Sequence, residues 1–322
     1  MAGAFVGVAD DATAVYWNPA GLATGPFFDL VLERVEGDAF PDGRDLPLDS
    51  ATRGTGGAAW TMALTTPAFG LSYYRIRAVS FPAGTAEMAS IDRETVRSGE
   101  VAVSSLLTRH FGATLVQSIG PGVAVGTTLK LVRATAVQRQ VAAATAPDAL
   151  DAASEFTGDT ETRFDLDAGL LVSVGAWRVG VVGRNLKQPE FEVSTDGSVA
   201  ADPMRLTRQV RAGLAFAPRS SLAGSNGPMT VALDVDLEPV DTVYGRRREL
   251  AAGAEAWWFG GRAGLRGGVR LNTLMRDDAH RDPAYAVGFS LSPKLGSLVE
   301  GQITFSRNEL EKGWGISTRL TY

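Results

Sequence analysis

The sequence of 322 residues has no cysteine and only two histidines, and these scarcities exclude several kinds of site. Without cysteine there is no disulfide, no thiolate-bound zinc and no cysteine nucleophile. His110 and His280 are far apart in sequence, which excludes a histidine-rich metal site. No run of about 18 apolar residues occurs, so the sequence predicts no transmembrane helix. The net charge of -5 gives no electrostatic support for a nucleic-acid partner.

In contrast, glycine is abundant, with 37 residues, and many short segments alternate apolar and polar residues. The stretch from Gly313 to Tyr322 shows the alternation well, because Trp314, Ile316 and Leu320 share one parity and polar residues share the other. Alternate side chains of a strand point to opposite faces, so this stretch predicts a strand with one apolar face. In a transmembrane barrel, such a strand would pair with the first one, because no strand edge can stay open in lipid.

The same alternation recurs along the chain and predicts about fourteen strands, an even number as in bacterial single-chain barrels. The connections also alternate in length. They are short at 66–68, 120–122 and 260–261, and long at 38–54, 80–100, 139–162 and 191–205. Short turns at one end and long loops at the other are typical of outer-membrane barrels. The sequence therefore predicts an all-β protein, a single transmembrane antiparallel β-barrel.

Charged residues crowd the polar parity of these strands, which would face the lumen. The predicted lumen charge network consists of Asp29, Glu33, Asp165, Asp167, Arg211, Asp234, Asp236, Glu255, Arg262, Arg266, Arg270, Glu300 and Arg319. A turn at 260–261 would place Glu255 opposite Arg266, which predicts an ion pair. Two interpretations stay open: paired charges that stiffen a partly wet interior, or a lumen adapted to a polar solute. A wholly apolar tunnel is disfavoured, because burying these carboxylates would be costly.

Other candidate sites are weaker. The Asp165–Asp167 and Asp234–Asp236 pairs have the composition of acid–base dyads, but their repetition along several strands favours a lumen wall. Asp42, Asp45 and Asp49 offer oxygen ligands for calcium without EF-hand spacing, and no Ser-His-Asp motif is recognisable. We therefore expect no enzyme, no catalytic residue, no metal and no cofactor.

Two predicted loop segments have distinctive sequences, one helical and one basic. Residues 147–156 predict a short helix with proline in its first turn, placed in a long outer loop. The basic cluster Arg246-Arg247-Arg248 is either a solvated loop end or a contact for anionic lipopolysaccharide.

Residues 1–25 precede the first regular strand. Asp11 predicts the cap of a short helix over 12–18, which Pro19 ends. The motif Asp10-Asp11-Ala12 followed by Trp17-Asn18-Pro19-Ala20-Gly21-Leu22 resembles the start of outer-membrane long-chain fatty-acid transporters of the FadL type. It is still more similar to their PorV/PorQ and TraF-like relatives. The resemblance implies that residues 1–25 form a plug, or hatch, inside a barrel made by residues 26–322.

The resemblance also implies a location and two functions. The expected location is the bacterial outer membrane, after removal of a signal peptide that the sequence does not show. The first function is passive transport of a hydrophobic or amphipathic small molecule of the fatty-acid or hydrocarbon type, gated by the plug. The alternative is a PorV-like barrel that transports nothing and serves as shuttle or scaffold for a secretion or surface machine.

The resemblance implies partners and, for transport, an exit. The expected partners are outer-membrane lipid, lipopolysaccharide and either a hydrophobic ligand or a secretion or surface protein complex. The alternation loses phase at Tyr73-Tyr74, which predicts a bulge. In the transport reading this bulge marks a lateral gap through which the ligand leaves.

Overall fold

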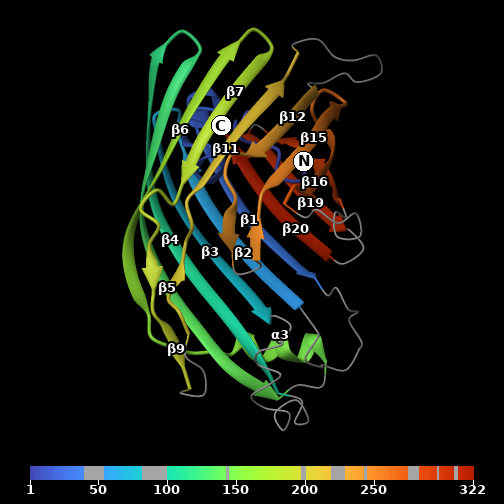
Figure 1. The fold of residues 1–322 in the computed structure, drawn as a ribbon. Helices are drawn as coiled ribbons and strands as arrows, with labels where there is room; N and C mark the ends of the chain where they lie inside the picture. Colours follow the sequence, from blue (N-terminus) through green and yellow to red (C-terminus); the bar gives the residue numbers. More distant parts are fainter. Residues whose placement is uncertain are drawn as a thin grey trace.

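A closed antiparallel sheet dominates the structure (Figure 1). The computed structural model describes residues 1–39, 54–81, 100–142, 145–196, 201–218, 229–242, 245–274, 283–295, 297–307 and 311–322. Within these ranges, fourteen strands form the barrel wall, which confirms the predicted number. They are β1 (Asp29–Ala39), β2 (Gly54–Thr65), β3 (Phe69–Phe81), β4 (Glu100–Gly120), β5 (Val123–Ala142), β6 (Glu161–Val174), β7 (Trp177–Arg184), β11 (Gln209–Phe216), β12 (Met229–Asp236), β15 (Glu249–Trp258), β16 (Ala263–Asn272), β17 (Ala284–Leu291), β19 (Ser297–Arg307) and β20 (Glu311–Thr321).

The barrel closes between its first and last wall strands. β1 pairs with β20 over its whole length, from Asp29 opposite Thr321 to Ala39 opposite Glu311. Beyond them, the N–H groups of Phe28 and Tyr322 each donate to the other residue's carbonyl oxygen at 3.1 Å. The ring therefore has no open edge at this seam, as the alternation in the last residues predicts.

The two faces of the wall differ in chemistry. Outward positions carry large apolar side chains, such as Leu71, Phe111 and Phe289, each about half exposed. Inward positions carry most of the predicted charge network, of which Asp29 and Asp165 are fully buried. An exposed apolar belt around a polar interior is the arrangement expected of a strand wall that faces lipid.

The two ends of the barrel also differ. Tight turns join β4 to β5 and β6 to β7 at one end, which lies at the top in Figure 1. Gly122 takes a left-handed conformation there (φ +72°), and a Cβ at this position would overlap the carbonyl oxygen of Ser173. β4 and β5 are the longest wall strands, with 21 and 20 residues, and they extend far toward the opposite end. That opposite end is the one at which the long connections were predicted.

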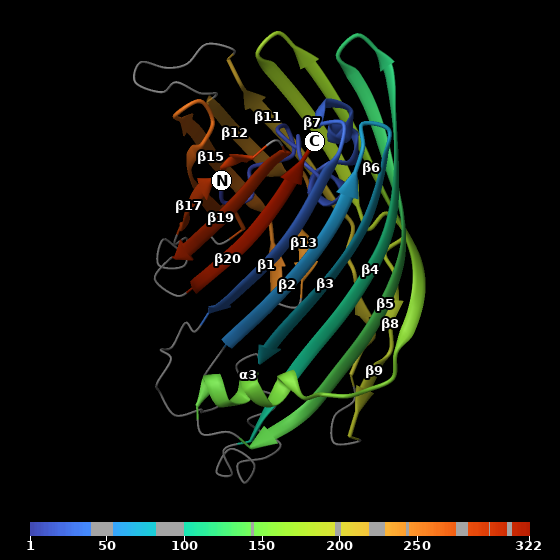
Figure 2. The ribbon, with the colours of Figure 1, turned by 180° about the vertical axis from the view of Figure 1, so that it is seen from behind.

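Helix α3 (Ala146–Ser154) lies outside the wall at the long-loop end, as Figure 2 shows. The Thr145 and Asp148 side chains form a capping box at its start. Ala149 and Ala153 pack on outward-facing Val79 and Phe81 of β3. The helix predicted over 147–156 is thus confirmed, and it covers the exterior of the extended strands.

At the same end, one short two-stranded pair folds over the lumen. The β8–β10 pair (Glu190–Phe191, Met204–Arg205) places Phe191 and Met204 on inward-facing Leu106 and Val132. β9 (Val193–Thr195) adds to β5 in parallel, and β13 (Val240–Thr242) pairs with β14 (Gly245–Arg247). A further short strand, β18 (Lys294–Leu295), precedes β19.

The N-terminal segment, residues 1–25, lies inside the barrel at the short-turn half (Figure 1). It contains α1 (Ala14–Trp17) and a 3-10 helix, η1 (Pro19–Thr24). The helix is shorter than predicted and Thr13 is its cap, because the Asp11 carboxylate instead accepts hydrogen bonds from Thr13 within a local turn. Nowhere in the described ranges is there a helix both long and apolar enough to span a membrane.

Candidate functional site

The N-terminal segment is held in the lumen by buried hydrogen bonds centred on Asn18. The Asn18 side chain is fully buried and donates through Nδ2 to the carbonyl oxygens of Val6 and Leu170, at 3.0 and 3.1 Å. Its Oδ1 accepts from the Ala20 N–H at 3.2 Å, which starts η1 together with Pro19. One side chain thus links two turns of the segment to β6.

Two wall carboxylates bind the backbone of the same segment. Asp234 on β12 accepts the N–H groups of Phe5 and Val6 at 2.7 and 2.8 Å. Asp29 on β1 accepts the N–H of Ala12 at 2.8 Å. Since a buried N–H needs an acceptor, these charges anchor the segment as well as line the wall.

The other motif residues meet the wall through charge and aromatic contacts. Asp10 lies 3.2 Å from Arg178 on β7, whose guanidinium also donates to the Val8 carbonyl. The Asp10 side chain is partly exposed, but burial within the barrel raises the pKa of its carboxyl. The neighbouring Asp11 carboxylate raises this pKa further. The Arg184 guanidinium lies over the ring of Tyr16 at 4.2 Å, with Trp17 close by.

Four glycines on the inner wall let residues 6–20 of the segment approach the sheet backbone. They are Gly126 on β5, Gly169 on β6, Gly180 on β7 and Gly213 on β11. A Cβ on Gly169 would overlap the Asn18 side chain, and a Cβ on Gly126 would overlap the Pro19–Ala20 backbone. We call this set the glycine patch.

A fully enclosed ion cluster lies between β5, β6 and the loop after β7. The Lys130 ammonium is 2.9 Å from Asp165 and 2.7 Å from Asp167, and each of the three side chains is at most 1% exposed. The two carboxylates also accept the backbone N–H groups of Lys187 and Asn185, at 3.2 and 2.8 Å. Such a cluster is stable only because every charge has partners.

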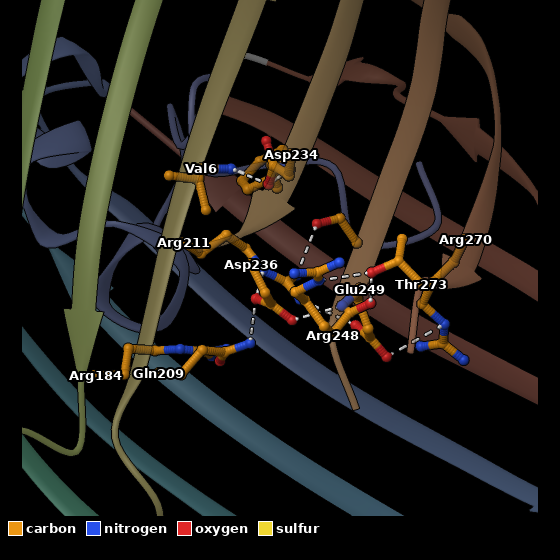
Figure 3. Close-up of polar contacts among 12 residues, drawn as sticks. Val6, Arg184, Gln209, Arg211, Asp234, Asp236, Arg248, Glu249, Arg270 and Thr273 are labelled. Carbon is orange, nitrogen blue, oxygen red and sulfur yellow. Dashed lines mark hydrogen bonds and ion pairs between the residues drawn. The ribbon is translucent and has the colours of Figure 1, made fainter. Parts of the chain in front are cut away.

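A second network joins β11, β12, β15 and β16, and Figure 3 shows its contacts. Arg211 donates to Asp236 at 2.7 Å and to Glu249 at 2.9 Å. Glu249 also faces Arg270 at 3.7 Å, while Gln209 donates to Asp236 at 2.7 Å. The network crosses four strands and ties them together from inside.

A third group of ion pairs lines the wall near the closing seam. Glu255 lies opposite Arg266 in the register and 2.8 Å from it, so the predicted pair is confirmed. Arg266 also lies 3.2 Å from Glu300. Arg319 on β20 pairs with Asp29 on β1 at 2.9 Å, across the seam itself.

Two features of the predicted site are wrong. Arg262 does not face the lumen: it is exposed in the turn between β15 and β16, because β16 begins one residue later, at Ala263. No bulge interrupts β3, since Tyr73 and Tyr74 pair in continuous register with both β2 and β4. Tyr74 points inward, where its ring contacts Tyr16 and His110. Because the N-terminal segment packs on this inward position, the position is aromatic instead of polar, and the apolar–polar alternation of β3 is interrupted there.

Outside the three networks, Glu33 faces the lumen and forms no ion pair with a described residue. Asp42, Asp45 and Asp49 lie outside the described residues. In the basic cluster, Arg248 donates to Thr273 at 2.8 Å and Arg246 lies 3.7 Å from Asp241. Within the described ranges, no group of three potential metal ligands comes together.

Sequence reasoning missed several contributors: Lys130, Arg178, Arg184, Glu249 and the glycine patch. All four charged residues lie on inward positions, which the strand parity could have shown. The glycine patch has no comparable signal, because glycine at a turn and glycine under a packed segment look alike in one sequence.

A cavity of about 300 Å³ lies beside the N-terminal segment. Phe5, Thr13 and Trp17 line it from the segment, and the wall contributes inward-facing residues of β1, β16, β19 and β20. These wall residues include Glu33, Arg266, Glu300, Ser317 and Arg319. The segment side of the cavity therefore contributes two aromatic rings and Asp11, and the wall side contributes several charged residues.

Residues 53–236 match the family described as the F plasmid transfer operon TraF protein, which is more than half of the chain. The chain belongs to this TraF family. Among curated proteins, none matches the sequence. The family match is in line with the TraF-like resemblance of the N-terminal motif, although it covers a different part of the chain.

Solved structures identify the fold of this TraF-family chain. It is similar to a FadL homologue of Pseudomonas aeruginosa, with a TM-score of 0.58, 12% identity, and 99% and 95% of the two chains covered. The toluene transporters TodX of Pseudomonas putida (TM-score 0.56, 10% identity, 99% and 96% covered) and TbuX of Ralstonia pickettii (0.56, 10%, 97% and 94%) are also similar. The fold is that of the FadL-type barrels.

Proposed function

We propose that this TraF-family barrel lies in the bacterial outer membrane and passes a hydrophobic or amphipathic small molecule. In this proposal residues 1–25 are the gate and residues 26–322 the barrel. The FadL homologue and the toluene transporters supply the precedent for the fold. The apolar outer belt and polar interior support the location.

The observation that carries the proposal is the cavity beside the N-terminal segment. A volume of about 300 Å³ is at the lower end of small-molecule sites, so it suits a compact solute. Phe5 and Trp17 offer apolar contact, while Glu33 and Arg319 offer hydrogen bonds to a polar group. An amphipathic solute satisfies both sides, whereas a purely apolar one offers no partner to Glu33.

Filling this cavity tests the proposal. Ser317 on β20 lines the cavity, and the neighbouring Thr318 points outward and is exposed. We expect Ser317→Phe in liposomes to reduce uptake of a labelled medium-chain fatty acid or monoaromatic compound by about tenfold. Thr318→Phe, which adds the same ring to the lipid-facing side, should leave uptake unchanged. Equal uptake by both variants and the wild type would remove the cavity from the path.

The proposed exit is lateral, beside β3 at Tyr73, and it requires the continuous pairing of β3 to open. Met62 on β2 lies directly opposite Tyr73. Directly paired antiparallel residues have Cα separations suited to a disulfide, and the chain has no cysteine of its own. Oxidised Met62→Cys/Tyr73→Cys should block uptake, and reduction should restore it.

The matched control for this exit is Ala252→Cys/Val269→Cys, a paired position between β15 and β16 on the outer face. It should transport equally in both redox states. If both oxidised variants transport normally, the solute does not leave through the β2–β3 seam.

A second candidate function, a non-transporting shuttle or scaffold, is favoured by a different observation. Among the described residues, each wall strand pairs with both of its neighbours. Hydrogen bonds that involve Asn18, Asp29 and Asp234 hold the N-terminal segment in place. Absence of uptake by wild-type protein, together with stoichiometric co-purification of a secretion component, would select this function instead.

A further inference from the structure

A row of arginines crosses the outer face of the barrel at the long-loop end. In the strand register, Arg34 lies opposite Trp60, Trp60 opposite Arg75, Arg75 opposite Arg109 and Arg109 opposite Arg133. All of these positions point outward, on the same face as the apolar belt. We call Arg34, Arg75, Arg109 and Arg133 the arginine row.

Ion pairs with described residues leave most of the arginine row without a counter-charge. Arg34 contacts Glu36, but Arg75, Arg109 and Arg133 form no ion pair with a described residue. Like charges directly opposite each other on neighbouring strands destabilise a sheet. Three such arginines side by side, without an ion pair to any described residue, favour an anion as a ligand.

The row stands at the edge of the apolar belt. Two residues closer to the short turns on each strand, the same face carries Leu32, Met62, Tyr73, Phe111 and Leu131. A groove of about 610 Å³ runs over the last four of these and over neighbouring side chains that are mostly apolar.

The position along β4 agrees with a membrane boundary. Ten residues, His110 to Ile119, separate Arg109 from the turn. At about 3.3 Å per residue and a tilt of about 40°, they span about 25 Å, the height of an outer-membrane apolar band. The row thus lies where headgroups of one leaflet would lie.

Helix α3 and residues 155–160 form a ledge above the row. Arg77 donates to the Ser154 carbonyl at 2.5 Å, and Arg139 donates to the Thr157 carbonyl at 2.8 Å, which fixes the ledge to the wall. Figure 2 shows α3 crossing the ends of these strands.

Two cavities lie between the ledge and the row. One of about 1080 Å³ is lined by Arg34, Arg75 and Arg77 and also by Glu36, Asp38 and Asp151. The other, of about 470 Å³, is lined by Arg109 and Arg133 and by no described carboxylate. The ledge therefore turns a line of charges into two open recesses.

We propose that this surface binds the phosphorylated sugar headgroup of an outer-leaflet glycolipid of the lipid A class, with acyl chains in the groove below. Arginine pairs well with phosphate because its donors form a planar fork. The row crosses four strand spacings, about 19 Å, which suits a headgroup with two separated phosphates better than a single phosphate. The inference rests on the proposed outer-membrane location but is independent of transport.

Binding is measured by native mass spectrometry of the full chain in detergent. The probes are bisphosphoryl lipid A, dephosphorylated lipid A, phosphatidylglycerol and inorganic phosphate. The test variant is Arg75→Gln/Arg109→Gln/Arg133→Gln. The control, Arg163→Gln/Arg205→Gln/Arg246→Gln, removes the same charge from exposed arginines outside the row.

We expect the wild type to bind bisphosphoryl lipid A about tenfold or more tightly than the test variant, and the control to bind within about twofold of wild type. Replacing the three row arginines by lysine should retain part of the affinity, which separates loss of charge from loss of fold. Equal binding by the test variant overturns the inference. So does dephosphorylated lipid A or phosphatidylglycerol binding as tightly, or inorganic phosphate displacing the lipid. Since no step measures uptake, a failed transport assay leaves this result standing.

Discussion

Lys130 shows what alternation along a strand can and cannot reveal at the scale of one residue. Its inward direction follows from its parity within β5, as it does for Asp165 and Asp167 on β6. Its enclosure does not follow, because the loop after β7 folds back and places Asn185 3.0 Å from the ammonium. Burial here depends on a contact between segments 55 residues apart, which no local pattern encodes.

Removing this cation should be costly. We expect Lys130→Met to lower the free energy of unfolding by about 3–5 kcal/mol, because two buried carboxylates lose their counter-charge. Urea unfolding in lipid vesicles, followed by tryptophan fluorescence, measures the change.

The triple variant Lys130→Met/Asp165→Asn/Asp167→Asn should recover much of that loss, since the amide oxygens can still accept the Lys187 and Asn185 N–H groups. Lys312→Met, at an exposed position, should change stability by about 0.5 kcal/mol or less. A Lys130→Met protein as stable as wild type would show that the cluster is not ionised as a unit.

The N-terminal segment shows, at the scale of an element, why an internal plug obscures a strand pattern. Wall residues that meet lipid and wall residues that meet Val15 or Leu22 are both apolar, so parity loses its meaning beneath the segment. That is the physical reason for the mistaken bulge at Tyr73-Tyr74. The same contact explains the glycine patch, where the segment's backbone replaces side chains.

The glycine patch can be tested with a single methyl group. We expect Gly169→Ala to push Asn18 from its position at a cost of about 1–3 kcal/mol, because the new Cβ would overlap the Oδ1 atom of this fully buried side chain. Hydrogen exchange of peptides from residues 1–25 should become faster, while the wall strands keep their protection.

Gly301→Ala is the matched change, since a Cβ at that wall position meets no atom within 4 Å. Its exchange should equal that of the wild type. Unchanged exchange in Gly169→Ala would mean that the N-terminal segment accommodates the added methyl group without losing protection from exchange.

Helix α3 illustrates a different limit of sequence reading at this scale. Its existence follows from proline in the first turn and the Thr145–Asp148 cap. Its place on the outer wall depends on Val79, Phe81 and Val103, which look like any other lipid-facing strand residues. The arginine row was missed for the same reason, since only the register of five strands aligns it.

For the molecule as a whole, closure follows from the sequence more directly than any site does. Each wall strand carries its own alternation, and a lipid environment leaves no alternative to pairing the last strand with the first. The contents of the lumen do not follow from that rule, because a closed wall can surround water, side chains or a folded segment.

The division into gate and barrel can be tested by removing residues 2–25. No wall strand draws its pairing from this segment, so we expect the shortened protein to form a closed barrel that still migrates faster before heating on gels. Its ion conductance in planar bilayers should rise several-fold above that of the full chain, because the lumen loses its main occupant. Identical conductance would show that the loops at the other end, rather than residues 1–25, close the path.

The unequal strand lengths make the barrel lopsided when it is seen from outside. β4 has 21 residues whereas β7 has eight, so at about 3.3 Å per residue and a steep tilt the rim differs in height by about 30 Å around its circumference. A large molecule that approaches the long-loop end meets long strands on one side of the rim and short strands on the other. The uneven rim therefore limits the directions from which such a molecule can approach, before it contacts any binding residue.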